Sequence, residues 1–147
     1  MKLAFGSDHA GYQLKAHLME HLQNKGFECT DLGGFCPERI DYPVAGERVA
    51  RAVAAGEYEK GIIICGSGVG ISISANKVPG IRCVVCSEPY SAKMSIEHND
   101  ANILAMGERV VGAELACLIA DTWLESVFEG GRHAQRVDLI RGIEERG

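Results

Sequence analysis

The fold of this chain is decided by the stretch Gly61-Ile62-Ile63-Ile64-Cys65-Gly66-Ser67-Gly68-Val69-Gly70. Its first half is the most continuous apolar run in the chain, and three successive isoleucines favour a strand that is buried on both faces. Its second half contains three alternating glycines and leads into a helix-like segment, so the strand ends in a tight turn. A buried strand followed by such a turn and a helix is typical of an α/β protein with a parallel sheet.

The rest of the chain repeats this alternation of short apolar runs and longer amphipathic stretches. Helices are expected after the first run, at residues 45–55, after Pro89 and twice near the C terminus, where the last has an apolar face of Val137, Ile140 and Ile143. Strands are expected at residues 2–6, 27–32, 61–65, 82–87 and 102–106. The pattern predicts an α/β fold with a five-stranded parallel sheet.

Composition limits the function classes. The length of 147 residues, with 46% hydrophobic and 24% charged residues, matches one domain spanning residues 1–147. A net charge of -5 argues against nonspecific nucleic-acid binding, which depends on a basic surface. No apolar run approaches the ~18 residues that cross a bilayer, and no signal peptide is expected, so we predict a cytoplasmic protein without a membrane partner. The six cysteines lack the spacing of a disulfide framework, so we expect reduced thiols.

The glycine turn is the strongest local candidate for a binding site. The N–H groups of Gly66, Gly68 and Gly70 can point at an anion near a helix N-terminus, and they favour the thiolate of Cys65. Ile71 occupies the third glycine position of a dinucleotide fingerprint, and the lysine that closes a Walker loop is absent. The alternative is a tight turn around an inert, buried cysteine.

Polar residues at strand ends are further candidates. Asp8 and His9 follow the first strand, where a carboxylate and an imidazole can hold sugar hydroxyls or a phosphate. His98 precedes the fifth strand, and histidine suits acid/base chemistry near neutral pH. The alternatives are turn-forming residues in the first case and a helix-terminal histidine in the second.

Arginines near the C terminus can bind a phosphate. Arg132 and Arg136 are four residues apart, so a helix places both guanidinium groups on one face. Arg109 can join them from the other side of a pocket. A solvated charged face is the alternative.

Cys83 and Cys86 have the spacing of a redox or metal pair. They flank two valines in an expected strand. Successive side chains of a strand point to opposite faces, so two residues three positions apart do as well. No second CxxC accompanies them, so we interpret both as structural cysteines and expect no metal.

Seven ordered segments together carry a resemblance that spans nearly the whole chain. The set resembles the ribose-5-phosphate isomerase B family, which also includes the galactose-6-phosphate isomerase subunits. The segments are Gly6-Ser7-Asp8-His9-Ala10-Gly11, Asp41-Tyr42-Pro43, Ile64 to Ser72 with Ala75-Asn76-Lys77, Gly80-Ile81-Arg82, His98-Asn99-Asp100-Ala101-Asn102, Gly107-Glu108-Arg109 and Gly130-Gly131-Arg132-His133.

The resemblance implies a Rossmann-like three-layer sandwich and a metal-independent aldose–ketose isomerase of the non-oxidative pentose phosphate pathway, with no cofactor. It interconverts ribose 5-phosphate and ribulose 5-phosphate in a homodimer with shared active sites, or in a tetramer. Cys65 is then the base that moves a proton between carbons 2 and 1. Ser67 and the backbone amides of Gly66, Gly68, Val69 and Gly70 stabilise the enediolate.

The other implied roles concern ring opening and binding. His98 assists opening of the furanose ring, and Asp8 helps at the ring oxygen. Tyr42 and Asn99 contact the sugar, and the phosphate is held by His9, Arg109, Arg132 and Arg136. The partner chain is expected to supply His98, Asn99 and Arg109.

Some alternatives stay open. Gly34 to Ile40 and Val44 to Gly46 match the family pattern poorly, which leaves the length of the sugar undecided, and Cys36 has no assigned role. A six-carbon sugar phosphate such as allose 6-phosphate or galactose 6-phosphate is the main enzymatic alternative. A noncatalytic module that binds phosphorylated metabolites and a thiol redox protein are the others; Cys65 and His98 count against the noncatalytic module.

Overall fold

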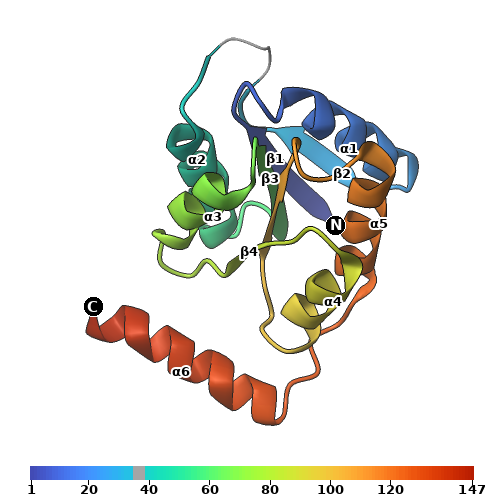
Figure 1. Ribbon diagram of the computed structural model, residues 1–147. Helices are drawn as coiled ribbons and strands as arrows, with labels where there is room; N and C mark the ends of the chain where they lie inside the picture. The colour runs from blue at the N-terminus through green and yellow to red at the C-terminus, as the bar shows by residue number, and fades with distance from the viewer. Residues whose placement is uncertain (35–38) are drawn as a thin grey trace.

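The computed structural model describes residues 1–34 and 39–147, in which five strands and six helices alternate (Figure 1). The strands are β1 (Lys2–Ser7), β2 (Glu28–Asp31), β3 (Lys60–Cys65), β4 (Cys83–Val85) and β5 (Ile103–Gly107). The helices are α1 (Tyr12–Asn24), α2 (Tyr42–Ala54), α3 (Val69–Asn76), α4 (Pro89–Glu97), α5 (Ala113–Glu125) and α6 (Arg132–Arg146). No helix in the described part of the chain has the length and apolar character that crossing a membrane requires.

The sheet is parallel, with the order β2-β1-β3-β5-β4, which confirms the predicted five-stranded sheet. Strand β3 lies at its centre and pairs with both β1 and β5. Ile62, Ile63 and Ile64 have no exposed surface because helices cover both faces of this strand.

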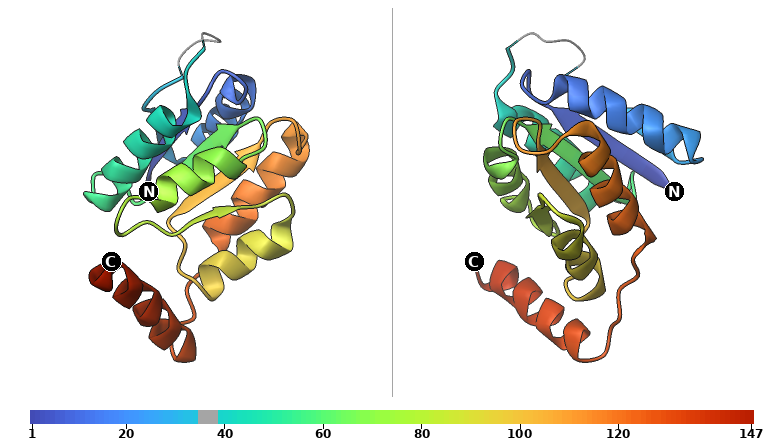
Figure 2. Two further views of the ribbon diagram at one scale, coloured as in Figure 1. Left: turned by 60° about the vertical axis from the view of Figure 1, so that its left-hand side comes forward. Right: turned by 45° about the vertical axis from the view of Figure 1, so that its right-hand side comes forward.

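Helices form a layer on each face of the sheet (Figure 2). Helices α1, α4 and α5 cover one face, where Leu18, Ile119 and Trp123 are fully buried. Helices α2 and α3 cover the other face with Val49 and Ile71. The expected Rossmann-like three-layer sandwich is therefore confirmed.

Two elements differ from the sequence prediction by more than one residue at an end. Helix α2 begins at Tyr42 rather than at residue 45, because Pro43 occupies the first turn, where a missing N–H costs nothing. Strand β4 is limited to Cys83–Val85. Cys83 and Cys86 pack into the cores on opposite faces of the sheet, as predicted.

Helix α6 stands apart from the two helical layers (Figures 1 and 2). Val137 is buried, but Ile140 and Ile143, which belong to the same predicted apolar face, are 41% and 61% exposed. The single chain therefore covers this face only in part. Near its C-terminal end, the carboxylate of Glu144 accepts the N–H of Gly80 at 3.0 Å.

A buried lysine ties α1 to the turn that follows β2. Lys15 is 1% exposed, and its Nζ lies 3.0 Å from the carboxylate of Asp31. The same Nζ donates to the carbonyl oxygens of Gly33 and Gly34 at 2.8 and 2.6 Å. These bonds fix the backbone at Gly33 and Gly34, where the segment between β2 and α2 begins.

We predict that Lys15→Met lowers the free energy of unfolding by about 2–4 kcal/mol, because it removes the buried cation that pairs with the Asp31 carboxylate and donates to the carbonyl groups of Gly33 and Gly34. Lys25→Met is the matched control. Lys25 pairs with Asp121 at 2.9 Å near the end of the same helix but is 43% exposed, so its loss lowers the free energy of unfolding much less. Urea unfolding measures both values, and equal losses would contradict the role of burial.

Candidate active site

The turn after β3 brings a sulfur atom to the carboxyl end of the sheet. Cys65 is the last residue of β3, and the N–H of Gly68 donates to its Sγ at 3.1 Å. Gly68 has φ +81°, a conformation that glycine adopts without strain, and it caps the N-terminus of α3. The hydroxyl of Ser67 accepts the N–H of Val69 at 3.2 Å. The turn thus directs the N–H of Gly68 at the sulfur of Cys65.

The turn after β5 is hydrogen-bonded to the turn after β3, which we call the cysteine turn. The N–H of Glu108 donates to the Cys65 carbonyl at 2.9 Å, and the N–H of Arg109 donates to the Gly66 carbonyl at 3.1 Å. These two bonds place the Arg109 side chain beside the cysteine of its own chain. The expectation that a partner chain supplies Arg109 is therefore wrong, since β5 neighbours β3 and the two turns bond directly.

Asp8 comes from the turn after β1. Its N–H donates to the Ile64 carbonyl at 3.3 Å, and its Oδ1 accepts the N–H groups of Ala10 and Gly11, each at 3.0 Å. The predicted turn-forming role is thus present. The carboxylate also faces the cavity, so the structure allows a second, chemical role.

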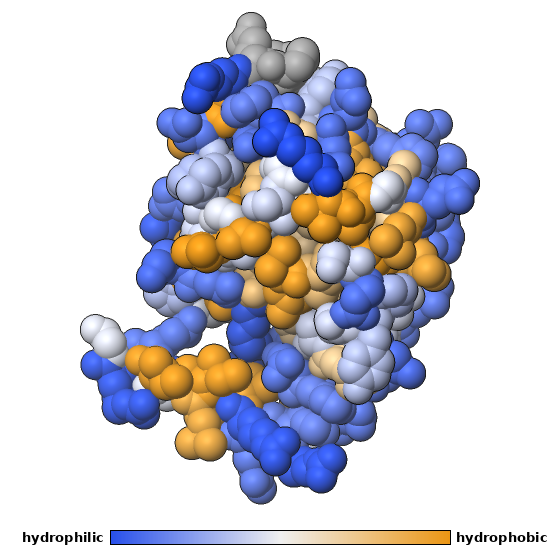
Figure 3. All heavy atoms as spheres, in the orientation of Figure 1, coloured by the Kyte–Doolittle hydropathy of each residue, from blue (hydrophilic) through white to orange (hydrophobic). Residues whose placement is uncertain are grey.

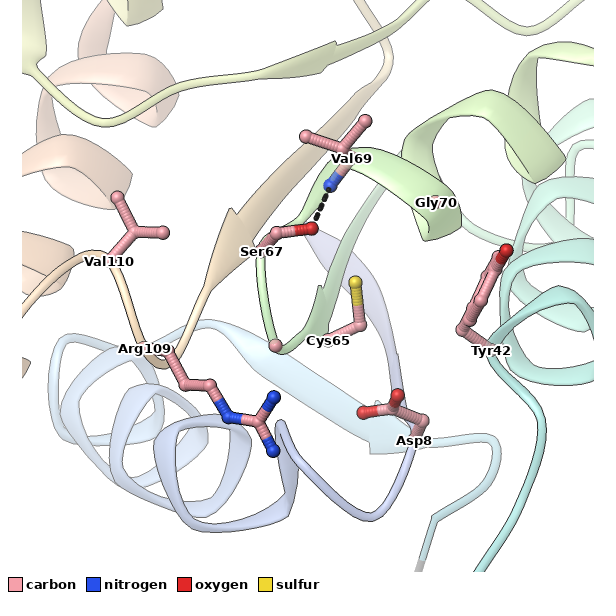
Figure 4. A pocket seen from close by; sticks show the side chains of 9 residues that line it. Asp8, Tyr42, Cys65, Ser67, Val69, Gly70, Arg109 and Val110 are labelled. Atoms are coloured by element: carbon pink, nitrogen blue, oxygen red, sulfur yellow. Dashed lines mark hydrogen bonds between the residues drawn. The ribbon is translucent and has the colours of Figure 1, made fainter.

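These three turns and the start of α2 surround a cavity of about 440 Å³ (Figure 4). The guanidinium of Arg109 and the carboxylate of Asp8 point toward one another across it. The Tyr42 ring forms another wall of the cavity. It packs so closely on Gly70 that a Cβ at Gly70 would lie 2.6 Å from the ring. The lining residues are Asp8, Tyr42, Cys65, Gly66, Ser67, Val69, Gly70, Arg109 and Val110.

The structure therefore brings together most of the residues that were predicted for proton transfer. Gly68 contributes through its N–H, which is directed at Cys65. Val110 was missed, because an exposed valine in a turn carries no motif; it is 57% exposed. His9 lies at the surface, where its Nδ1 is 3.3 Å from the Ile40 carbonyl. Cys36 and most of the Gly34 to Ile40 loop lie outside the described residues.

The other predicted residues lie at the opposite end of the sheet. His98 ends α4 and precedes β5, whereas Cys65 pairs with Gly107 at the far end of β5. At about 3.3 Å per residue, the strand alone separates the two groups by about 16 Å. Asn99, next to His98, and both Arg132 and Arg136, on α6, are exposed. Within one chain the predicted site is therefore split into two parts.

The second part is a cluster around His98, which we call the histidine cluster: His98, Glu129 and His133. Their ligand-type atoms all lie within 4.8 Å of one another. His98 and His133 stack with ring centroids 4.1 Å apart and planes 7° from parallel. Burial lowers the pKa of His133, and the nearby His98 and Arg132 act in the same direction. Sequence reasoning assigned no role to Glu129 or His133.

The remaining described cysteines do not suit redox chemistry. Burial raises the pKa of Cys86 to about 11 and raises that of Cys83 further. Burial also raises the pKa of Cys29 to about 11 and that of Cys117. Since the thiolate is the reactive form, these thiols are poor nucleophiles near neutral pH.

A doubly wound parallel sheet with a thiol, a carboxylate and a guanidinium around a cavity at its carboxyl edge defines an α/β protein that binds a small, polar molecule. The model of the Ribose/Galactose Isomerase family matches residues 3–140. The chain belongs to this family.

Individual proteins agree closely with this assignment. The ribose-5-phosphate isomerase B of Escherichia coli strain K12 is 58% identical over 99% of this chain and 97% of its own length. The structure of Clostridium thermocellum ribose-5-phosphate isomerase B superposes with a TM-score of 0.98 at 57% identity, covering 99% of both chains. A crystal structure of the Mycoplasma genitalium ribose-5-phosphate isomerase B with bound ribulose-5-phosphate gives a TM-score of 0.96 at 36% identity, covering 99% of this chain and 97% of the other.

The contact between the two turns yields a test. A Cβ at Gly107 would lie 2.5 Å from the backbone of Ser67, so we predict that Gly107→Ala displaces the cysteine turn and lowers the unfolding free energy by about 1–3 kcal/mol. Gly112→Ala is the matched control, because its Cβ would meet nothing within 4 Å and its φ is -74°. Chemical denaturation compares the two. An unchanged Gly107→Ala variant would show that the turns are not in close contact.

Proposed function

We propose that this chain is an isomerase that interconverts ribose 5-phosphate and ribulose 5-phosphate, acting as a homodimer in the cytoplasm. The observation that carries the proposal is the sulfur of Cys65, which faces the cavity and accepts the N–H of Gly68 at 3.1 Å. The family membership and the identity to relatives with this name support the choice of reaction. The free thiols of the described cysteines agree with a reducing compartment.

The cavity offers the groups that aldose–ketose isomerisation needs. The thiolate of Cys65 takes the proton from carbon 2 of the open aldose. The C–H electron pair forms the double bond between carbons 1 and 2, and the carbonyl pair moves to oxygen 1. The proton then returns to carbon 1, while the hydroxyl proton of carbon 2 moves to oxygen 1 and the ketone forms at carbon 2. N–H groups of the glycine turn and the hydroxyl of Ser67 face the developing oxyanion, and each such donor is typically worth about 2.7–4 kcal/mol. Asp8 and Tyr42 contact the sugar, and Arg109 neutralises negative charge.

The division of the site supports the homodimer. His98, Asn99, Arg132 and Arg136 are all required in the proposed mechanism, for ring opening, sugar contact and phosphate binding. They lie at the opposite end of the sheet from Cys65, so one copy cannot apply both sets to a single sugar of five carbons. A second copy that places its histidine cluster and α6 over the first copy's cavity completes the site.

Exposed apolar side chains lie where such a contact would form. Leu139 and Ile143 on α6 are 69% and 61% exposed, and Val69 and Val110 at the cavity rim are 49% and 57% exposed. Figure 3 shows that apolar side chains gather on the middle of one face of the body and on α6. Apolar patches of this kind mark protein–protein interfaces. In the proposed homodimer, a second copy covers the apolar face of α6.

Six-carbon sugar phosphates are the second candidate, because the family description includes galactose. The same pocket and the same proton transfer serve both. The test is to measure turnover with ribose 5-phosphate and with allose 6-phosphate. A strong preference for the six-carbon sugar would overturn the choice of substrate.

We predict that Cys65→Ala lowers turnover of ribose 5-phosphate by about 10²–10⁴-fold, the usual contribution of a general base. Binding of the sugar phosphate, measured by calorimetry, stays close to normal. In heavy water the unaltered protein places deuterium on carbon 1 of the ketose, and the variant does not. Cys117→Ala is the control, and near-normal turnover of Cys65→Ala would refute the role of the thiol.

Mixed dimers test the shared site. We predict that Cys65→Ala and His98→Ala chains, each inactive alone, regain about half of the normal activity when one chain of each kind is purified as a dimer through two different tags, since one of two sites then carries neither change. The control pairs Cys65→Ala with Arg109→Ala. Both residues belong to one chain's cavity, so every site keeps one change and activity stays at the level of the parents. Recovery in the control, or none in the first pair, would contradict the proposal.

A further inference from the structure

His98 is held from two sides by residues that the proposed mechanism does not use. Its Nε2 lies 3.5 Å from the Oε1 of Glu129, and its ring stacks on His133. His98 itself is 38% exposed, so one side of the ring remains open to solvent.

The backbone places Glu129 beside His98. The N–H of Glu129 donates to the carbonyl of Glu97, the residue that precedes His98, at 3.0 Å. The backbone of Glu129 is therefore fixed at the end of α4, and its side chain, which is 49% exposed, extends from there to His98. A carboxylate opposite Nε2 favours the tautomer that carries its proton on Nε2, which leaves the lone pair of Nδ1 available as a base.

His133 supplies a fixed surface for the ring. It is 6% exposed, and its N–H donates to the Gly130 carbonyl at 3.0 Å. Because burial lowers its pKa, His133 stays neutral and can stack on His98 without adding a second positive charge.

Two imidazoles and a carboxylate also form a donor set for a transition metal, but the stacking does not fit one. A metal lies in the plane of each imidazole at about 2.0–2.1 Å from the nitrogen. Two nearly parallel rings with centroids 4.1 Å apart cannot both direct a lone pair at one ion. The arrangement instead suits a ring that is oriented by its neighbours.

We propose that Glu129 and His133 are positioning residues that orient His98 for opening the sugar ring. The proposal rests on the proposed isomerase function and assigns the histidine cluster to the ring step alone. Proton transfer between carbons 2 and 1 belongs to the Cys65 cavity of the other copy.

The chemistry of ring opening explains why orientation matters. The anomeric hydroxyl gives its proton to a base, and its O–H electron pair becomes the second bond of the carbonyl. The ring oxygen leaves carbon 1 with the electron pair of the C–O bond and takes up a proton. The imidazole of His98 can accept the first proton at Nδ1 and return it to the ring oxygen, and Glu129 stabilises the imidazolium between the two events.

The two sugars separate this step from proton transfer. Ribose 5-phosphate is a closed ring that must open. Ribulose 5-phosphate cannot form a furanose, because its phosphate occupies the oxygen that would attack carbon 2. Exchange of its carbon-1 hydrogen with heavy water therefore requires Cys65 but no ring opening.

The test compares two rates in the full-length protein: turnover of ribose 5-phosphate and carbon-1 exchange of ribulose 5-phosphate. We expect Glu129→Gln and His133→Ala to lower kcat with ribose 5-phosphate about 10-fold or more, as part of the contribution of an acid/base group. Carbon-1 exchange of ribulose 5-phosphate, followed by proton NMR, stays within about 2-fold of normal in the same variants. His133→Phe keeps a flat ring beside His98 and restores turnover relative to His133→Ala. Glu125→Gln, an exposed glutamate at the end of α5, is the control.

Equal losses in turnover and exchange would overturn the inference, because they would show a general or structural effect. Unchanged turnover in Glu129→Gln and His133→Ala would overturn it as well. Failure of the proposed function has a different signature: the unaltered protein would then show no exchange, or exchange that survives Cys65→Ala.

Discussion

The structure depends on the position of β3 between β1 and β5. This strand is paired on both sides and covered on both faces, so Ile62 to Ile64 are fully buried. Cys65 therefore lies at a fixed position at the carboxyl end of the central strand. The turn that follows is bonded to the turn after β5 through the Cys65 and Gly66 carbonyls. Its N–H groups and the side chains of Asp8 and Arg109 are placed by this framework rather than by flexible loops.

The same framework explains why the site is divided. In a parallel sheet, residues that follow strands and residues that precede strands lie at opposite edges. Cys65 follows β3 and His98 precedes β5, so no local change can bring them together within one chain. In the proposed homodimer, the carboxyl ends of the strands of one copy face the opposite strand ends of the other. Helix α6, which has few contacts with its own chain and exposes Leu139 and Ile143, is the element best placed to form that contact.

The sequence predicted the five-stranded sheet and the cavity residues well, because both follow from local signals. Three successive isoleucines and alternating glycines define β3 and its turn, and parallel topology brings Asp8 to the same edge. The prediction failed where partners are distant in sequence or absent. Arg109 was assigned to the wrong chain because the pairing of β5 with β3 is not visible in either segment. The apolar face of α6 was predicted from its spacing, but spacing does not reveal which surface, or which copy, covers it.

The histidine cluster illustrates the same limit. Glu129 lies in a short segment between α5 and α6 with no periodicity, and only the bond from its N–H to Glu97 brings it beside His98. The stacking of His133 on His98 likewise joins two segments whose distance in the chain hides their contact. Residues that position others, unlike those that carry a motif, emerge only from three-dimensional contacts.

The central claim is that the thiol of one copy and the cationic groups of another act on one sugar phosphate. A crystal structure with bound ribose 5-phosphate tests it most directly. We expect carbons 1 and 2 within about 3.5 Å of Cys65 Sγ, the separation of a reactive complex, and the phosphate beside Arg132 and Arg136 of a second copy. A sugar bound entirely by one chain, or one whose carbons lie far from the sulfur, would contradict this account.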